Sequence, residues 1–329
     1  MRLCSYLKYL CAGLTIILLA ANAHAANLVL THSGAPGSLY DISAREFVRR
    51  ANARLPEDHL ISLAPDPERR ADHLESVKQG QVTMALLSAE MLRVSDLFAI
   101  FELPYLIRTR TQVRGLRQTI VDPYLQPAAE ANDLHILGVW ENGFHHITND
   151  LQPIAHPRDF KDVRIAVEDN AWRGKTFSAF GAKPAPVSSA TVKGAAQDRP
   201  ADGLDAPLNE IEARNLLSSQ RFLTLSDHIY SPAFLVARKG SLDALPPEVR
   251  EILATEAREM ESWIQTMAIR IESNLLDRLD LDMNVAYANV TTFELMTRPL
   301  YGQYIRNVPE GINLIIAISS AKEQTAANQ

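Results

Sequence analysis

The stretch ERRADHLESVKQGQVTMALLS, residues 68–88, joins a predicted helix to a predicted strand. Its helical part ends at Gly80, a residue type that commonly closes helices. The segment VTMALLS is apolar over most of its length, as expected for a strand buried on both faces of a parallel sheet. Upstream, NLVLTH and HLISLAPD are predicted strands, separated by an amphipathic helical pattern over residues 39–55. This β-α-β-α-β order predicts a doubly wound α/β lobe.

The same alternation predicts a second lobe. Its predicted strands include HILGVWEN and FHHITND on either side of an Asn142-Gly143 turn, then VRIAV, RFLTLSDH and AFLVARK. A helix is predicted over residues 171–180. We expect an α/β fold in which lobe I comprises residues 26–143 plus 232–272, and lobe II residues 144–231 plus 273–329.

One predicted helix is unusually long. Apolar residues recur at three- and four-residue steps from residue 246 to about residue 279. Some 34 residues at about 1.5 Å each span roughly 50 Å, which exceeds one small domain. We therefore expect this helix to cross both lobes, with a coiled-coil seam as the alternative.

The N-terminus has the build of a secretory signal peptide. Arg2 and Lys8 precede an apolar run, and Ala23-His24-Ala25 is a small-x-small cleavage pattern. The run is shorter than the roughly 20 apolar residues that span a bilayer. Residues 1–25 are predicted to be removed, leaving a periplasmic or secreted product. Both cysteines lie in this segment, so a sizeable core rather than disulfides must stabilise the mature chain.

The charge of the chain excludes one class of partner. The formal net charge is −6, and it becomes −8 when Arg2 and Lys8 leave with the signal peptide. Without a basic block, binding to nucleic acid is not expected, because phosphate contacts need clustered Lys and Arg. The sequence contains no dinucleotide, phosphate-loop or zinc-protease motif, so no cofactor is predicted.

The histidine pair His145-His146 is the only adjacent pair in the mature chain. On a strand, neighbouring side chains face opposite sides, so the two cannot chelate one ion as a simple pair. One alternative is a structural role for each ring. Another is a secreted enzyme in which one histidine is a base beside Asp150, Glu141 or Asp169.

Several segments together resemble one family, the DctP-type periplasmic solute-binding proteins of TRAP transporters. FELPYLI resembles the family's F-x-L-P-F/Y-L signature, and LGVWENGFHHITND resembles its G-x-W-x-N/G-G-x-R-x-x-T-N stretch. From Asp159 to Pro207 the two patterns run without a gap, and FGAKPAPVSSATVKGAAQDRPADGLDAP resembles the family's block that begins G-A-x-P-x-P and ends D-G-x-E-N-P. The resemblance covers nearly the whole mature chain.

The resemblance implies a periplasmic-binding-protein-like fold whose two lobes close over a small organic acid. It also implies a solute receptor, not an enzyme, that delivers C4-dicarboxylates or other organic acids to the small and large subunits of a membrane permease. A monomer is expected. The alternative is a binding module of altered specificity that serves a sensor or another partner.

The chain departs from the family at the positions that hold the ligand. Where the family has two arginines and an asparagine, this sequence has His145, Ala166 and Ala206. The family's Glu of E-x-Y corresponds to Thr191. Alanine cannot form the two charge-assisted bonds that arginine gives a carboxylate. Arg164, two residues before Ala166 on the same strand, is the best candidate for a substitute cation, and Arg173 a weaker one.

Eight residues are predicted to contact the ligand. Glu90, Glu168 and Asp205 would give the cleft negative character, which suggests a ligand less anionic than a dicarboxylate. The predicted ligand-binding residues are His32, Ser88, Trp140, Asn142, His145, Arg164, Thr191 and Asp205.

Overall fold

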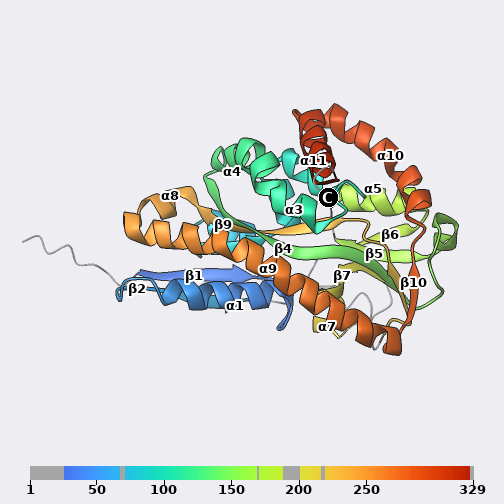
Figure 1. Cartoon of the computed structure of the whole chain (residues 1–329), viewed down its shortest axis with the longest axis horizontal. Helices are drawn as coiled ribbons and strands as arrows, with labels where there is room; N and C mark the ends of the chain where they lie inside the picture. Colours follow the sequence, from blue (N-terminus) through green and yellow to red (C-terminus); the bar gives the residue numbers. More distant parts are fainter. Residues whose placement is uncertain (1–25, 67–70, 169, 188–200, 216–218, 327–329) are drawn as a thin grey trace, which may run out of the picture.

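The structure is a computed structural model that describes residues 26–66, 71–168, 170–187, 201–215 and 219–326. The predicted signal peptide, residues 1–25, lies outside these ranges. The described chain forms two α/β lobes that share a sheet system (Figure 1). Within these ranges, no helix is long and apolar enough to cross a membrane.

The first sheet has the order β2-β1-β3-β9-β4. Its first three strands are parallel, and β9 is antiparallel to both neighbours. Every residue of β3 is buried, as predicted from its apolar run. The β-α-β-α-β order is confirmed. The elements of this part are β1 (Ala26–His32), α1 (Leu39–Asn52), β2 (His59–Pro65), α2 (His73–Lys78), β3 (Met84–Leu87), β4 (Leu134–Asn149) and β9 (Tyr230–Arg238).

Local signals set the helix ends. Ser38 caps α1, and Asp72 caps α2 through the backbone N–H of Glu75. Such caps satisfy N–H groups that have no partner within the helix. The α2 helix therefore begins at His73, later than predicted, and the chain leaves it through Gly80 with φ of 71°.

The second sheet continues from the same strand β4. The C-terminal part of β4 pairs with β7 and β8, while β7 pairs with β5, β5 with β6, and β8 with β10. The α5 helix ends at Gly181 in the left-handed region, as expected for a helix terminus. The elements of this part are β5 (Arg164–Glu168), α5 (Ala171–Phe180), β6 (Lys183–Val187), β7 (Gly203–Pro207), α7 (Leu208–Ala213), β8 (Phe222–Leu225) and β10 (Asn284–Tyr287).

A single strand, β4, joins the two sheets. The sequence predicted two strands around an Asn142-Gly143 turn, but the structure has one 16-residue strand with an irregularity between Glu141 and Gly143. Gly143 has φ of 121°, a conformation open mainly to glycine, so the extra residue is absorbed as a bulge. Residues before the bulge pair with β9, and His145–Asn149 pair with β7.

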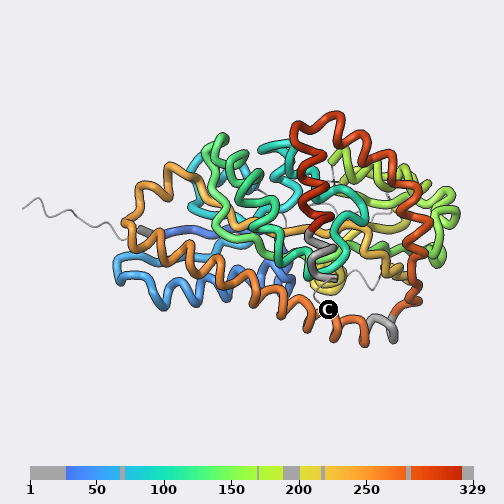
Figure 2. The backbone as a smooth tube through the Cα atoms, turned by 45° about the horizontal axis from the view of Figure 1, so that its top comes forward, coloured from blue at the N-terminus to red at the C-terminus, as the bar shows by residue number. Residues whose placement is uncertain are grey.

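The helix α9 (Pro247–Asp282) crosses both parts of the molecule, as predicted (Figures 1 and 2). Its first half buries Val249, Leu253 and Met260 against the first sheet and α1. Near its end, Leu275 joins the apolar cluster of the second sheet. Only a helix of this length can contribute to both cores, which ties the lobes together.

The remaining helices and helical turns pack around the two sheets. They comprise the 3-10 turns η1 (Ala89–Arg93), η2 (Asp96–Glu102) and η4 (Pro157–Phe160), the π-helical turn η3 (Arg117–Leu125), and α3 (Arg110–Leu116), α4 (Gln126–Glu130), α8 (Lys239–Asp243), α10 (Val290–Asn307) and α11 (Gly311–Ala326).

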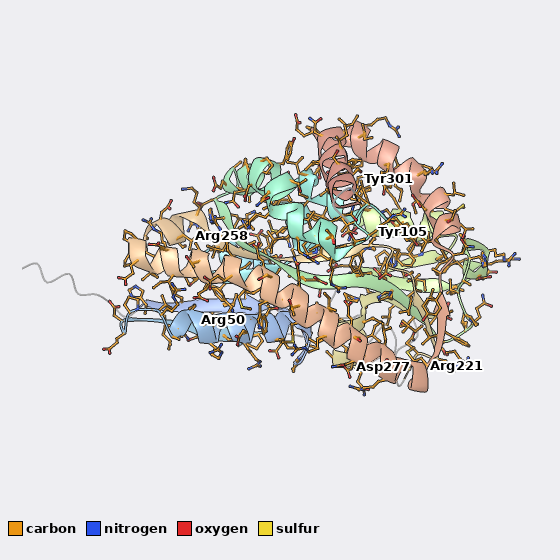
Figure 3. All side chains as sticks on the ribbon, viewed as in Figure 1. Arg50, Tyr105, Arg221, Arg258, Asp277 and Tyr301 are labelled. Carbon is orange, nitrogen blue, oxygen red and sulfur yellow. The ribbon has the colours of Figure 1, made fainter. Side chains whose placement is uncertain are left out.

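The C-terminal helices return to elements of lobe I. Leu314 and Ile318 of α11 share a buried cluster with Leu116. The hydroxyl of Tyr301 on α10 donates to the carbonyl of Pro104 at 2.7 Å, in the region labelled in Figure 3. The lobe boundaries at residues 143, 231 and 272 stay a prediction. The helix α11, which that prediction assigns to lobe II, packs against Leu116 of lobe I.

Replacing Gly138 by alanine should destabilise the fold. The added Cβ would lie 2.6 Å from Trp140 Nε1 and 3.1 Å from the carbonyl oxygen of Ala257 on α9. Overpacking of this kind typically costs about 1–3 kcal/mol, measurable by urea unfolding. Gly174→Ala is the matched control, because a Cβ there meets nothing within 4 Å. Equal unfolding midpoints for Gly138→Ala and the wild type would contradict the close packing of β4 on α9.

Candidate functional site

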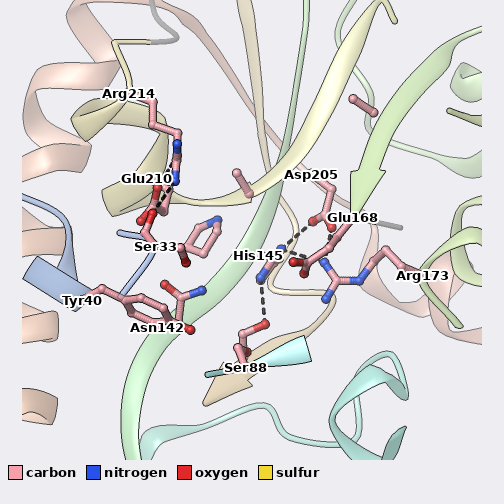
Figure 4. A pocket seen from close by; sticks show the side chains of 14 residues that line it. Ser33, Tyr40, Ser88, Asn142, His145, Glu168, Arg173, Asp205, Glu210 and Arg214 are labelled. Atoms are coloured by element: carbon pink, nitrogen blue, oxygen red, sulfur yellow. Dashed lines mark hydrogen bonds and ion pairs between the residues drawn. The ribbon is translucent and has the colours of Figure 1, made fainter. Parts of the chain in front are cut away.

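A pocket lies where the two sheets meet at β4 (Figure 4). The space open to the centres of water-sized molecules is about 80 Å³. At about 10–15 Å³ for each water, this holds several waters or one small organic molecule. The first sheet and its loops contribute Ser33, Tyr40, Ser88, Asn142 and Ser231, and the second contributes His145, Ala166, Glu168, Arg173, Asp205, Ala206, Pro207, Glu210 and Arg214.

Arg173 is the central buried cation of this pocket. Asn170 caps α5 and places Arg173 in the first turn, where its side chain is fully buried. Its Nε and Nη2 donate to the two oxygens of Glu102 at 2.8 and 3.1 Å, and its Nη1 donates to Asp205. Burial by itself lowers the pKa of Arg173, but Asp205 and Glu102 raise it above the ordinary value. The guanidinium is therefore permanently charged and held by two carboxylates.

His145 and Asp205 form the second half of the same cluster. His145 Nδ1 lies 2.7 Å from Asp205 Oδ1, and its Nε2 lies 2.8 Å from the Ser231 hydroxyl oxygen. His228 Nε2 approaches Asp205 at 3.2 Å. Burial raises the pKa of Asp205, but Arg173 and His145 outweigh it and hold that pKa well below its usual range. Asp205 is thus ionised and shared by three neighbours.

The two adjacent histidines have different partners, as strand alternation predicts. His146 Nδ1 accepts a hydrogen bond from the Ser226 backbone N–H, away from the pocket. Burial, then the neighbouring rings of His228 and His145, lower the pKa of His146 to about 3. His146 is therefore neutral and structural. Among the described residues, no group of three His, Cys, Asp or Glu side chains is placed to hold a metal ion.

The alternative of an enzyme placed Asp150, Glu141 or Asp169 beside a catalytic histidine. The described contacts of His145 do not include these acids. Asp150 is bound by Arg221, and Glu141 by Arg110. Asp169 lies outside the described residues. The acid beside His145 is Asp205 instead.

Four predicted contact residues line the pocket: Ser88, Asn142, His145 and Asp205. Ala166 and Ala206, where the resemblance implies an arginine and an asparagine, also line it. Thr191 lies outside the described residues.

Trp140 and His32 are packing residues rather than pocket-lining ones. Trp140 is 1% exposed, packs against the tilted ring of Phe47 at 5.4 Å between ring centroids, and donates from Nε1 to the Ala257 carbonyl. His32 is completely buried 3.8 Å from Asp41, and burial lowers its pKa to about 4. Both lie on strands that lead to the pocket, but their side chains turn into the core.

Arg164, the preferred candidate for a substitute cation, does not line the pocket. It is exposed at the start of β5 and forms an ion pair with Asp202 at 2.8 Å. It shares a strand face with Ala166 but lies at the outer end, so its guanidinium turns toward solvent. The weaker candidate, Arg173, does line the pocket, as does Arg214.

A second buried cluster adjoins the pocket at the bulge of β4. Arg110 donates to Glu141 at 2.7 Å and to Glu272 of α9 at 2.7 Å. Burial raises the pKa of Glu141 to about 7, although Arg110 opposes the shift. The pKa of Glu272 is raised for the same reason. One arginine therefore serves two buried acids.

Glu141 should make folding stability depend on pH. Its folded pKa of about 7 exceeds the ordinary 4.5, so the folded state binds an extra proton between these values. The free energy of unfolding therefore falls as pH rises through this window, by up to about 3 kcal/mol. Urea unfolding of Glu141→Gln at pH 4.5 and pH 8 should lack this loss, whereas the exposed control Glu57→Gln should retain it. An identical pH dependence in Glu141→Gln and the wild type would sink the assignment.

Removing Arg173 should cost far more stability than removing Arg164. Arg173→Met leaves Glu102 without its bidentate partner in a buried site, and such a loss typically costs about 3–5 kcal/mol. Arg164→Met removes an exposed pair, for which little change is expected. Urea unfolding compares the two variants. Matching midpoints for both would show that the buried cluster does not form.

Comparisons with known proteins agree with this architecture. The family model described as bacterial extracellular solute-binding protein, family 7 (DctP) matches residues 30–307. The chain is similar to the 2,3-diketo-L-gulonate-binding periplasmic protein YiaO of Escherichia coli, with 24% identity over 85% of this chain and 88% of that protein. It is also similar to the C4-dicarboxylate-binding protein DctB of Bacillus subtilis, with 23% identity over 83% and 81% of the two chains.

Solved structures show the same fold. A sugar acid binding protein of Advenella mimigardefordensis in complex with galactonate matches with a TM-score of 0.85, 19% identity, and coverage of 90% of this chain and 98% of that one. A TRAP periplasmic solute binding protein of Polaromonas bound to D-erythronate matches with a TM-score of 0.83, 22% identity, and coverage of 89% and 98%. Because the family model spans most of the chain, this protein belongs to the bacterial extracellular solute-binding protein family 7, the DctP family.

Proposed function

We propose that the protein is the extracytoplasmic receptor of a TRAP transport system. It captures a small organic ligand in the pocket between the lobes and delivers it to a membrane permease. The observation that carries the proposal is the pocket itself, whose polar side chains come from both sheets at the strand that joins them. Family membership supports the role, and related proteins are named as binders of sugar acids or C4-dicarboxylates.

Ligand binding favours a closed arrangement of the lobes. Ser33 and Ser88 reach the pocket from the first lobe, whereas His145 and Asp205 reach it from the second sheet. A ligand that touches both sets has more contacts when the lobes are together, and this difference shifts the population toward closure. The permease then distinguishes loaded from empty receptor by its shape. β4 and α9, which run through both lobes, are the elements that bend.

Location and partners follow from the same proposal. A cleaved signal peptide of residues 1–25 exports a monomeric receptor to the periplasm, where it meets the small and large permease subunits. No catalytic step is proposed. A sensory module would bind ligand in the same way and differ only in its partner, so ligand uptake by cells carrying the permease distinguishes the two.

The binding role is tested on protein purified directly from the periplasm. Native mass spectrometry is expected to show a bound small molecule, released under mild denaturation and identified by its mass. His145→Ala should weaken binding of that molecule at least about tenfold, because the ring faces the pocket and orders Asp205 and Ser231.

The matched control is Trp140→Phe, which alters a core residue and should leave the affinity unchanged. Small-angle scattering should show a more compact protein with ligand than without it. Retained affinity in His145→Ala, or identical scattering curves in both states, would contradict the proposal.

A further inference from the structure

The pocket has more acids than cations among its described lining residues. Glu168, Asp205 and Glu210 face two arginines, Arg173 and Arg214. A fourth acid, Glu102, lies directly behind and binds Arg173. A ligand entering this space therefore meets a wall with an excess of negative charge.

Both arginines are already paired with carboxylates of the protein, so neither offers an unpaired guanidinium to an anionic ligand. Three N–H groups of Arg173 already donate to the carboxylates of Glu102 and Asp205. Arg214 Nε donates to Glu210 at 2.5 Å, and its Nη2 donates to the Ser33 carbonyl at 3.1 Å. A guanidinium paired with a carboxylate presents little net positive charge to a third group.

A second observation, independent of this charge count, concerns Asn142. Its side-chain oxygen is buried at the pocket, with no hydrogen-bond partner in the part of the chain described. A buried acceptor without a partner is costly, so a donor is expected to complete it. An ammonium or hydroxyl group supplies a donor, whereas a carboxylate supplies only acceptors.

We propose that the pocket takes a small hydroxylated organic cation, with its ammonium group against the acidic wall and its hydroxyls toward Ser33, Ser88 and Asn142. This ligand class rests on the proposed receptor function. Ala166 and Ala206 line the same space, and their side chains offer no donor to a carboxylate. The ammonium group donates charge-assisted hydrogen bonds to the carboxylates and pairs with their charge, whereas a carboxylate ligand can do neither.

The test varies only the charge of one group. Gluconate, sorbitol and glucamine share a six-carbon hydroxylated skeleton and differ at C1, which is a carboxylate, an alcohol or an aminomethyl group. Erythronate, erythritol and 1-amino-1-deoxyerythritol form a four-carbon series of the same kind. Isothermal titration of ligand-free full-length mature protein is expected to give the amine at least about tenfold tighter binding than the acid in one series, equivalent to ~1.4 kcal/mol. The polyol should bind with intermediate affinity.

Two variants test whether the pocket charge sets this order. Ala166→Arg introduces a cation into the pocket lining and should shift preference toward the acid. Ala166 is 2% exposed, so this variant could fail to fold. Glu210→Gln is the second variant, since it keeps the side-chain size and releases Arg214 from its carboxylate. It should reduce the amine-to-acid affinity ratio several-fold.

Each outcome decides the proposal. Tighter binding of the acid, or equal binding of amine and polyol, would overturn it. If none of the six compounds binds, the charge of the molecule released in native mass spectrometry decides, with a cation supporting the proposal and an anion overturning it. Absence of any bound molecule and of any binding contradicts the receptor function itself and the ligand class with it.

Discussion

The continuity of β4 through both sheets is the constraint on which the rest of the structure depends. It is possible because Gly143 accepts φ of 121° and lets the strand bulge without ending. A Cβ there would approach Glu272 Oε1 at 3.4 Å and Asn209 Nδ2 at 3.5 Å. The bulge therefore lies against both α9 and α7, and it sets Asn142 and His145 on its two sides, where both reach the pocket.

The buried cluster around Arg173 positions its members more than it stabilises the fold. Removing charges from water costs several kcal/mol for each ion, so a buried ion pair adds little net stability over apolar packing. Its geometry is nevertheless strict, because a bidentate guanidinium fixes Glu102, and Glu102 belongs to η2 of the first lobe. Arg173 thus ties helix α5 of the second lobe to the first lobe directly beneath the pocket.

The fold was predictable because its sequence signals are local. The site depends on the direction of individual side chains and on partners that are distant in the sequence. Strand alternation, the apolar run of β3 and the periodicity of α9 are each contained in one segment. Alternation along β5 places residues 164 and 166 on the same face of the strand, but it does not predict that Arg164 pairs with Asp202. Trp140 was misplaced because its core partner, the Ala257 carbonyl, is over a hundred positions away. Ser231 reaches His145 only through the antiparallel pairing of β9 with β4, for which no single segment carries a signal.

The buried acids around β4 differ in the direction of their pKa shifts, because their charged neighbours differ. Glu141 and Glu272 share the single cation Arg110, and burial raises the pKa of both. Asp205 is also buried, yet Arg173 and His145 hold its pKa down. Protonation can therefore relieve negative charge at the bulge, whereas Asp205 keeps its charge on the pocket side of β4. This fixed charge is the one that the proposed cationic ligand would meet.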